Sequence, residues 1–411
     1  FSLRPHQTIA VDALRDSLKA GNKRIILSAP CSMGKTHIAG YIAMKAVQKN
    51  PNMRVAFFCD RLKLVSQTEK VFRDMNLKYS VLQADDPRYD PNKSIQIVST
   101  ATAIRRKHFT YDLAIIDEAH QMYKGLLDLM KRYSNVVHIG LTATPYSRSM
   151  GSEGLWQDLV VTTTPQELMD QGWLCKTDYY QSRTADFSGV KLKKSHTGNA
   201  DYDSEALGQR MAADETLAGD IVANYVKHSN GLTKRAVCFA PSIAYSKSLV
   251  ERFNKEIGQE IAIHIDGYDD VETRRLKYQD FQDGYYKIMV NSRLLNTGWD
   301  DPSVSICIDA YKSASLTAWL QRVGRIWRTH PDKEKAIVLD HAGNLAHFGA
   351  YPESFVPSEL HTGERNFDER KQVKKREKEP VLHQCKVCSS VFTGLRCKCG
   401  WELPVGTPML K

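Results

Sequence analysis

Two successive series of short apolar runs, each alternating with amphipathic stretches, occupy most of this 411-residue chain. The runs are rich in Val and Ile and are bounded by turn or polar residues, as are the strands of parallel sheets buried on both faces. The first series lies at 24–29, 54–59, 95–99, 113–116 and 136–141, and the second at 236–239, 261–265, 287–290, 304–308 and 336–340. Helical patterns lie between them, for example at 38–48, 62–75, 243–256, 272–282 and 315–325. This alternation predicts an α/β fold with doubly wound parallel sheets.

The two series suggest a division of the chain into two α/β domains, with boundaries at 1–174 and 175–345. A polar stretch between about 183 and 215 shows no clear strand, so we expect a surface excursion near the junction. Residues 346–380 are assigned to a linker, within which 364–379 are dense in charge and fit either a solvated helix or a flexible connection. Residues 381–411 form a short cysteine-rich module.

The segment Ala29–Thr36 joins the first predicted strand to a predicted helix. Such a loop can wrap backbone N–H groups around phosphates and direct a helix N-terminus at them. Lys35 would reach the β- and γ-phosphates, and the Thr36 hydroxyl would hold Mg²⁺. Ala29 stands where the usual pattern has its first Gly, so the phosphate-loop motif is imperfect.

An acidic tetrad, Asp117-Glu118-Ala119-His120, directly follows the apolar run 113–116. Ligands of open α/β sheets bind at the carboxyl ends of the strands, which is where these side chains would lie. Asp117 is placed to hold Mg²⁺, and Glu118 to polarise an attacking water. The alternative is that the acids merely cap the next helix, which the upstream Gly-Lys-Thr makes less attractive.

With these two motifs the chain resembles the superfamily-2 helicases and translocases of the DEAD/DEAH type, and the resemblance continues in order over about residues 1–345. The segments that carry it are 3–7, before motif I; 29–36, motif I; 58–62, motif Ia; 99–102, motif Ib; 117–120, motif II; 141–145, motif III; 237–240, motif IV; 296–302, motif V; and 321–328, motif VI. Motif I departs from the family by having Cys31 and Ser32 where Thr and Gly are frequent, and motif III has Thr142 where many relatives have Ser.

The resemblance implies two tandem RecA-like lobes with ATP and Mg²⁺ bound between them. It implies that Arg325 and Arg328 are arginine fingers, since guanidinium groups stabilise the charge that develops on the γ-phosphoryl group. Further nucleotide-site candidates by motif position are Arg4, Gln7 (the expected base contact), Ser32, Gly34, His120, Asp300 and Gln321. Thr142 and Thr144 would couple the nucleotide state to lobe position. The alternative for the arginines of motif VI is a basic helix face.

A nucleic-acid strand would cross both lobes and be held through its phosphates, largely without sequence preference. By motif position the candidate contacts are Arg61, Thr100, Arg105, Ser242 and Thr297. The basic run at 105–107 is an equal candidate for a solvated loop. The closest resemblance is to DNA-directed members such as phage UvsW-like helicases and restriction-subunit translocases, which favours DNA over RNA.

Four cysteines in the tail, Cys385, Cys388, Cys397 and Cys399, supply the ligands of a Cys₄ zinc ribbon, although the second pair is closer than the usual CxxC. The module is too short to build a core, so a metal would stabilise its fold. Disulfides are the alternative. Lys386, Arg396 and Lys398 make the module basic, which suits contact with duplex DNA, a fork or a protein partner.

Composition supports this assignment, because the formal net charge of +10 indicates a polyanionic partner. Nine cysteines are too few for a disulfide scaffold, no apolar run reaches the roughly 20 residues of a membrane span, and residues 1–5 show no signal core. We therefore expect an intracellular protein of a bacterial or phage-infected cell.

The predicted function is an ATP-dependent DNA helicase or translocase acting on single-stranded, forked or branched DNA in replication, recombination or repair. Alternatives are an RNA-dependent ATPase, or the translocating subunit of a restriction-type complex that does not unwind DNA; a non-catalytic recruitment module with a degenerate ATPase fold is disfavoured because the ATPase residues are present.

Overall fold

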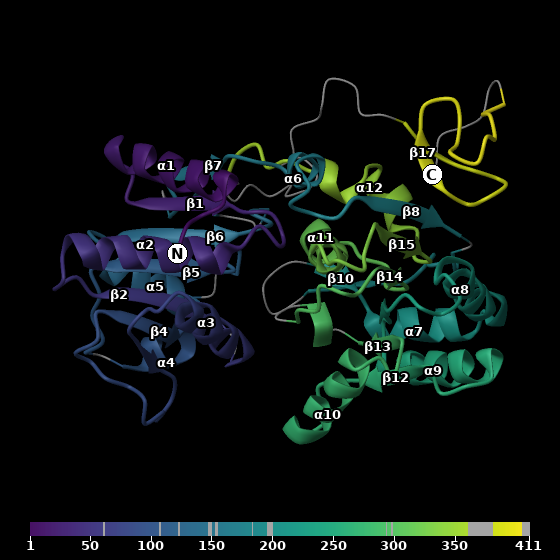
Figure 1. Cartoon of the computed structure of the whole chain (residues 1–411), viewed down its shortest axis with the longest axis horizontal. Helices are drawn as coiled ribbons and strands as arrows, with labels where there is room; N and C mark the ends of the chain where they lie inside the picture. Colours follow the sequence, from purple (N-terminus) through teal and green to yellow (C-terminus); the bar gives the residue numbers. More distant parts are fainter. Residues whose placement is uncertain are drawn as a thin grey trace. The chain divides into compact units, whose positions relative to one another are not determined.

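The computed structural model describes residues 1–60, 62–106, 108–121, 124–146, 150–152, 155–182, 184–194, 200–292, 294–296, 299–360 and 381–404. The chain forms two compact units, which we call lobe 1 and lobe 2 (Figure 1). Lobe 1 consists of Phe1–Pro165 and a return segment that begins at Val356. Lobe 2 consists of Gln166–Phe355 and the cysteine-containing segment at the C-terminus.

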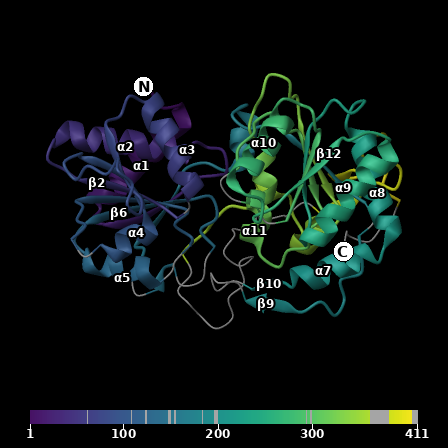
Figure 2. The ribbon, with the colours of Figure 1, turned by 90° about the horizontal axis from the view of Figure 1, so that it is seen from below.

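Lobe 1 is built on a seven-stranded sheet with the order β3-β4-β2-β5-β6-β1-β7, and every pairing in it is parallel. Its strands are β1 Arg24–Ser28, β2 Val55–Cys59, β3 Tyr79–Leu82, β4 Ile95–Ser99, β5 Leu113–Asp117, β6 Val137–Thr142 and β7 Asp158–Val161. Its helices are α1 Pro5–Lys19, α2 Lys35–Lys49, α3 Leu62–Asp74, α4 Thr100–Arg105 and α5 Lys124–Arg132. In Figure 2, α1, α2 and α3 lie on one side of the sheet and α4 and α5 on the other. The strands are continuous apolar runs because helices cover both faces.

Lobe 2 contains a second parallel sheet, of six strands, with the order β12-β13-β11-β14-β15-β8. Its strands are β8 Thr177–Gln181, β11 Ala236–Phe239, β12 Ala262–Ile265, β13 Ile288–Asn291, β14 Ile306–Asp309 and β15 Ala336–Asp340. Its helices are α6 Pro165–Asp170, α7 Ser204–Ala212, α8 Glu215–His228, α9 Ile243–Ile257, α10 Val271–Gln282, α11 Leu316–Val323 and α12 Asn344–Phe348, with short 3₁₀ turns η2 Leu294–Asn296, η3 Gly324–Ile326 and η4 Pro352–Ser354. Alternate residues of the strands form one core cluster with α7, α8 and α9. The predicted α/β class with two parallel sheets is confirmed.

The expectation of a polar excursion without strands at 183–215 is wrong. The segment contains the antiparallel pair β9 Leu192–Lys194 and β10 Ala200–Tyr202, followed by α7. Asp203 caps α7 by accepting a bond from the Glu205 N–H at 3.2 Å, and Leu207 and Met211 are fully buried. The hairpin is polar because it lies outside the core, whereas α7 buries only one narrow face.

The C-terminal module holds a two-stranded antiparallel sheet, β16 Leu382–Gln384 and β17 Val391–Thr393, and lies beside β8 in Figure 1. Within the described part of the chain, no helix is both long and apolar enough to cross a bilayer.

Candidate active site and metal centre

The phosphate-loop segment of lobe 1 leaves the carboxyl end of β1 and enters α2. Ser32 and Gly34 both take positive φ values, +68° and +92°, so the loop turns with its backbone in left-handed conformations. Gln7 supports this turn from α1, because its Nε2 donates to the Met33 carbonyl at 2.9 Å. A Cβ on Gly34 would lie 2.5 Å from that same Nε2, and the φ of +92° is one that residues with a Cβ rarely adopt, so the position favours glycine. The loop therefore presents a backbone turn and the first residues of α2, Lys35 and Thr36, at one edge of the sheet.

Gln7 has a structural role in lobe 1, and the base contact expected of it stays a prediction. Its side chain is buried, and its Oε1 accepts a bond from the Arg4 N–H at 3.0 Å while its Nε2 holds Met33. Gln7 thus fixes the start of α1 to the phosphate loop. Arg4 itself is exposed at the N-terminus of α1.

The acidic tetrad lies at the same sheet edge as the phosphate loop. Asp117 ends β5 opposite Leu141 in β6, and the Ala29 N–H that begins the loop donates to the carbonyl of Thr142, which ends β6, at 2.8 Å. Glu118 has φ of +48°, a left-handed conformation that turns the chain sharply after the strand. The edge thereby brings together Lys35, Thr36, Asp117, Glu118, His120 and Thr142.

Burial perturbs two titratable groups at this edge. Burial and the neighbouring Glu118 carboxylate raise the pKa of Asp117 to about 7, and Lys35 opposes the shift. Burial lowers the pKa of His120, so the imidazole is neutral at neutral pH. Burial makes the charged form of Asp117 unfavourable, and a bound cation would stabilise that form. Asp117 is therefore a suitable ligand for a cation.

Thr142 connects the tetrad to the segment after β6. Its buried hydroxyl lies 2.9 Å from His120 Nδ1 and accepts a bond from the Thr144 N–H at 3.0 Å. His120 Nδ1 also lies 3.4 Å from Glu118 Oε2. Glu118, His120, Thr142 and Thr144 thus form a chain of contacts, and the coupling role of the two threonines stays a prediction.

Lobe 2 carries the predicted arginine fingers in the turn after α11. Arg325 lies in η3 and donates from a terminal guanidinium nitrogen to the Trp299 carbonyl at 3.0 Å. Arg328 forms an ion pair with Asp300. Asp300 is therefore the ion-pair partner of Arg328 in this structure. Gln321 is buried on α11.

Arg322, the remaining arginine of motif VI, is a structural residue. It is 1% exposed, its Nε donates to Asp309 Oδ1 at 3.2 Å, and its guanidinium lies 4.7 Å from the centre of the Tyr311 ring. Asn344 donates to the other Asp309 oxygen at 2.8 Å. The arginines of motif VI thus divide into one that holds the core and two that lie nearer the surface.

Lys333 is a residue that sequence reasoning missed. It is 6% exposed, and its Nζ donates to the carbonyls of Pro302, Val304 and Ile326 at 2.7, 3.0 and 3.1 Å. Burial lowers its pKa to about 8. These bonds connect the segment after Asp300 to the turn that carries Arg325. No sequence motif indicates them.

The nucleic-acid candidates differ in accessibility. Thr100 and Ser242 are buried; Thr100 Oγ1 donates to the Cys59 carbonyl at 3.0 Å, and Ser242 Oγ caps α9 by accepting from the Tyr245 N–H at 3.2 Å. Both hydroxyls hold loops in place in this structure, and the contact of these two residues with a nucleic acid stays a prediction. Arg105 is exposed at the end of α4. Arg61 and Thr297 lie outside the described residues.

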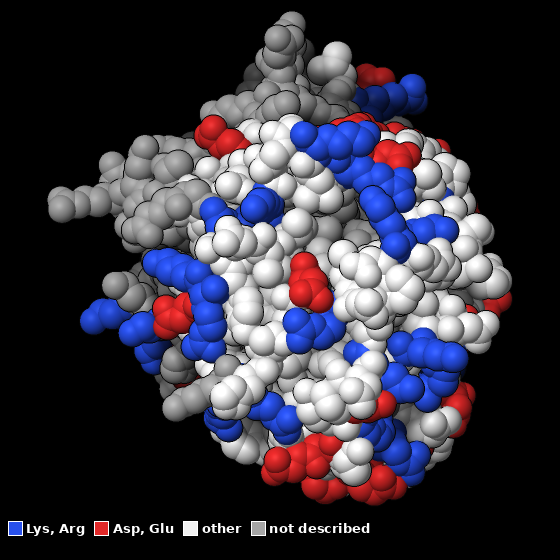
Figure 3. All heavy atoms as spheres, turned by 90° about the vertical axis from the view of Figure 1, so that its left-hand side faces the viewer, with Lys and Arg blue, Asp and Glu red and all other residues white. Residues whose placement is uncertain are grey.

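Among the residues that the structure describes, positive charge is not gathered into one strip on the face of lobe 1 that Figure 3 shows. Blue Lys and Arg side chains form several separate groups, with red Asp and Glu side chains among them and along the lower margin. A net charge of +10 therefore does not by itself locate a nucleic-acid track on this face.

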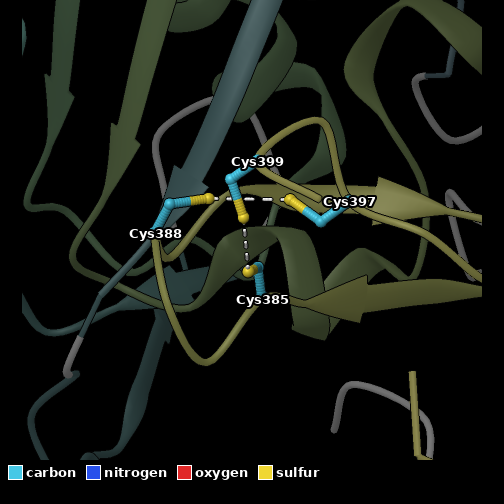
Figure 4. Close-up of side chains that lie close together, drawn as sticks. All are labelled: Cys385, Cys388, Cys397 and Cys399. Atoms are coloured by element: carbon cyan, nitrogen blue, oxygen red, sulfur yellow. Dashed lines mark hydrogen bonds between the residues drawn. The ribbon is translucent and has the colours of Figure 1, made fainter. Parts of the chain in front are cut away.

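The four tail cysteines converge at one point of lobe 2, where their side chains point toward one another (Figure 4). All four sulfur atoms lie within 4.8 Å of one another, with Cys385–Cys399 at 3.5 Å and Cys388–Cys397 at 3.6 Å. Tetrahedral zinc with Zn–S bonds of about 2.3 Å separates its sulfurs by about 3.8 Å, so the donor set fits this metal. The distances exceed a disulfide bond, and all nine cysteines are free. Burial opposes ionisation of Cys385, but backbone N–H groups of Cys388 and Val387 lower its pKa to about 7.

Comparisons with known proteins agree with this geometry. Residues 1–147 match the family described as "Type III restriction enzyme, res subunit", and residues 219–330 match "Helicase conserved C-terminal domain". A 51.5 kDa protein of Lactococcus phage (isolate 7-9) is 26% identical over 89% of this chain and 75% of its own length. The DNA 3'-5' translocase XPB2 of Sulfurisphaera tokodaii is 24% identical over 82% of this chain and 81% of its own length.

Among solved structures, the ATP-dependent Type ISP restriction-modification enzyme LlaBIII bound to DNA superposes with a TM-score of 0.60 at 16% identity. The match covers 83% of this chain but only 28% of that enzyme. It therefore shows similarity of fold and nothing about activity. The ordered motifs, the two parallel-sheet lobes and the two family matches lead to one assignment: the chain carries two RecA-like lobes of the superfamily-2 helicase type and is an ATP-hydrolysing enzyme.

Proposed function

We propose that this protein is an ATP- and Mg²⁺-dependent DNA translocase or helicase that acts on single-stranded, forked or branched DNA. The observation that carries the proposal is the carboxyl edge of the lobe 1 sheet. Three neighbouring strand ends there bring a phosphate-loop turn, two adjacent carboxylates and a histidine–threonine pair together. This set matches what phosphoryl transfer needs, namely charge neutralisation, a metal ligand and a group that orients water.

The residues of lobe 1 fit ATP and Mg²⁺. Lys35 and the backbone of the loop at Ser32 and Gly34 would hold phosphates, and oxygen atoms of Thr36 and Asp117 are the hard ligands that Mg²⁺ prefers. When bound, the ion would neutralise charge on the phosphates. Glu118 would orient the attacking water and accept its proton. His120 and Thr142 would keep Glu118 in place, since His120 lies 3.4 Å from its carboxylate.

Lobe 2 would supply the positive charge that stabilises the phosphate groups during hydrolysis. Arg325 and Arg328 are the arginines of motif VI that are not committed to the core, and a guanidinium can stabilise the developing negative charge. The ion pair with Asp300 would hold the Arg328 side chain in position for this role. Reopening after hydrolysis would let the protein advance along a strand, with Thr142 and Thr144 relaying the change.

DNA is favoured over RNA by the relatives rather than by the site. The translocase XPB2 carries DNA in its name, and the LlaBIII structure was determined with DNA bound. The match of residues 1–147 to restriction res subunits favours a second candidate, a translocating subunit that moves on DNA without separating strands. Replication or repair proteins are proposed partners, through the C-terminal module.

An ATPase panel tests the proposal and its alternatives. Hydrolysis is measured with no nucleic acid and with single-stranded, duplex, forked and four-way DNA, and with single-stranded RNA. We expect at least about tenfold stimulation by DNA and little by RNA. Stimulation by RNA alone would replace the DNA assignment with an RNA-dependent ATPase. Stimulation by DNA without strand displacement on a fork would favour the restriction-type translocase.

We propose further that Cys385, Cys388, Cys397 and Cys399 bind one Zn²⁺. The sulfur geometry supports this, as does the small size of the module, whose apolar cluster consists of Cys385, Phe392 and Cys397 with Cys388, Trp401 and Leu403 packed against it. Elemental analysis should find one zinc per chain, and a Cys388→Ser/Cys397→Ser variant should lose it.

A further inference from the structure

The cysteine module, residues 381–404, lies against β8, the edge strand of the lobe 2 sheet. β8 ends that sheet and pairs with β15 on one side only. On its other side the Gln181 N–H donates to the Ser389 carbonyl at 3.2 Å, and the Gln384 side-chain amide donates to the Gln181 carbonyl. Tyr180 and Ser390 form an antiparallel bridge. The module thus satisfies backbone groups at the carboxyl end of β8 that an edge strand would otherwise expose.

Lys398 is the side chain that ties the metal ligands to this edge. It stands between Cys397 and Cys399, and its Nζ lies 2.9 Å from Asp178 Oδ2 and donates to the Tyr180 hydroxyl at 2.7 Å. The ammonium group also lies 4.6 Å from the centre of the Tyr180 ring. Lys398 and Tyr180 are 218 positions apart in the chain, so this contact joins the module to a distant segment of lobe 2.

Lys386 provides an internal comparison. It occupies the corresponding place in the first cysteine pair, between Cys385 and Cys388, but it is exposed and forms no ion pair within the described residues. Of the three basic residues expected to suit this module to DNA or a protein partner, Lys398 therefore contacts β8 of lobe 2 instead. Arg396 has a loose ion pair with Glu402 at 3.9 Å.

A third contact comes from the segment after α12. The Tyr351 hydroxyl donates to the Val391 carbonyl in β17 at 3.0 Å, and its ring lies 4.9 Å from that of Tyr179 in β8. The module is therefore held from two sides, whereas its own apolar cluster is small. A unit with so little core depends on the metal and on the surface that it covers.

We propose that the Cys₄ module is a metal-held cover for the β8 edge of lobe 2, and that Lys398 couples metal retention to this docking. The inference rests on the proposed zinc binding. It makes the module a fixed part of lobe 2 rather than a freely swinging DNA contact. Loss of the metal should uncover the edge at Gln181, and disruption of the edge should speed loss of the metal.

The test uses the full zinc-loaded chain and two measurements. Zinc release to excess chelator is followed with the chromophore 4-(2-pyridylazo)resorcinol. Amide hydrogen exchange is followed in the peptide that spans 177–182, with a peptide spanning 24–28 in lobe 1 as reference. The variants are Lys398→Met on the module and Asp178→Asn on lobe 2. Lys386→Met is the matched control, and Lys335→Met controls for the weaker 3.8 Å contact of Asp178.

We expect zinc release to be about three- to tenfold faster in Lys398→Met and Asp178→Asn, the range expected for a partly exposed ion pair with its hydrogen bonds, and unchanged in both controls. We also expect chelation to raise exchange at 177–182 but not at 24–28. One zinc per chain, with unchanged exchange at 177–182 and wild-type release from Asp178→Asn, would overturn this inference alone. A wild-type chain that binds no zinc would overturn the zinc assignment and this inference together.

Discussion

Replacing Arg322 by Met separates a structural arginine of motif VI from the two proposed to act on the nucleotide. Arg322 and Asp309 are 1% and 0% exposed, so removing the guanidinium leaves a carboxylate in the core. Breaking a buried pair from one side costs about 3–5 kcal/mol. Because Asn344 still donates to Asp309, we expect a loss near the lower end. For a domain of about 150–250 residues, each kcal/mol lowers the melting temperature by about 2–4 °C, so lobe 2 should melt at least about 6 °C lower.

Differential scanning calorimetry of the full chain measures this change, and ATP hydrolysis is assayed well below the lowered transition. We expect Arg322→Met to retain most of the DNA-stimulated rate under those conditions, whereas Arg325→Met should melt normally and lose it. Adding Asp309→Asn to Arg322→Met should recover part of the stability, because the buried charge is gone. Normal melting of Arg322→Met together with abolished hydrolysis would refute this reasoning and place Arg322 among the catalytic groups.

Three further changes test other parts of the molecule. Glu118→Gln should lower kcat for ATP by about 10²-fold or more while leaving melting and nucleotide binding unchanged, because the amide cannot accept a proton; a wild-type rate would contradict the role of Glu118. Lys333→Met should destabilise lobe 2 by about 2 kcal/mol or more in calorimetry, since three buried carbonyls lose their donor, and unchanged melting would show that those bonds are dispensable. Burial raises the pKa of Glu353 from its usual 4.5 to about 7, so the folded protein holds this proton up to a pH at which the unfolded chain has released it. The stability from this group is complete below pH 4.5 and is lost as the pH rises through 7, a difference of about 3 kcal/mol that should be absent in Glu353→Gln and is read from denaturation at pH 4 and 8.

The strands that carry the site were predictable because they are buried on both faces and therefore appear as uninterrupted apolar runs. Strand β8 was not, since Thr177 and Asp178 are polar and only one side of this strand is paired within the sheet. The four tail cysteines were found from their spacing. What spacing could not show was that the module docks on β8, because that contact joins residues 218 positions apart.

The candidate site was predictable to the level of motifs, but not of contacts. Motif order placed Lys35, Asp117 and Glu118 at one sheet edge, where the structure has them. It also named Gln7, Thr100 and Ser242 as ligand contacts, which stay predictions, but it did not indicate the bonds that these side chains make to the protein itself. A buried hydroxyl or amide satisfied by a neighbouring loop has the same sequence signature as one that meets a ligand. Lys333 had no signature, because its partners are backbone carbonyls.

The central claim is that ATP hydrolysis by these two lobes drives movement along DNA. Displacement of a labelled triplex-forming oligonucleotide from duplex DNA with a single-stranded tail measures that movement directly, without requiring strand separation. We predict displacement by the wild-type chain that depends on ATP and Mg²⁺ and is absent with Glu118→Gln. DNA-stimulated hydrolysis without any displacement, on tails of either polarity, would contradict the account.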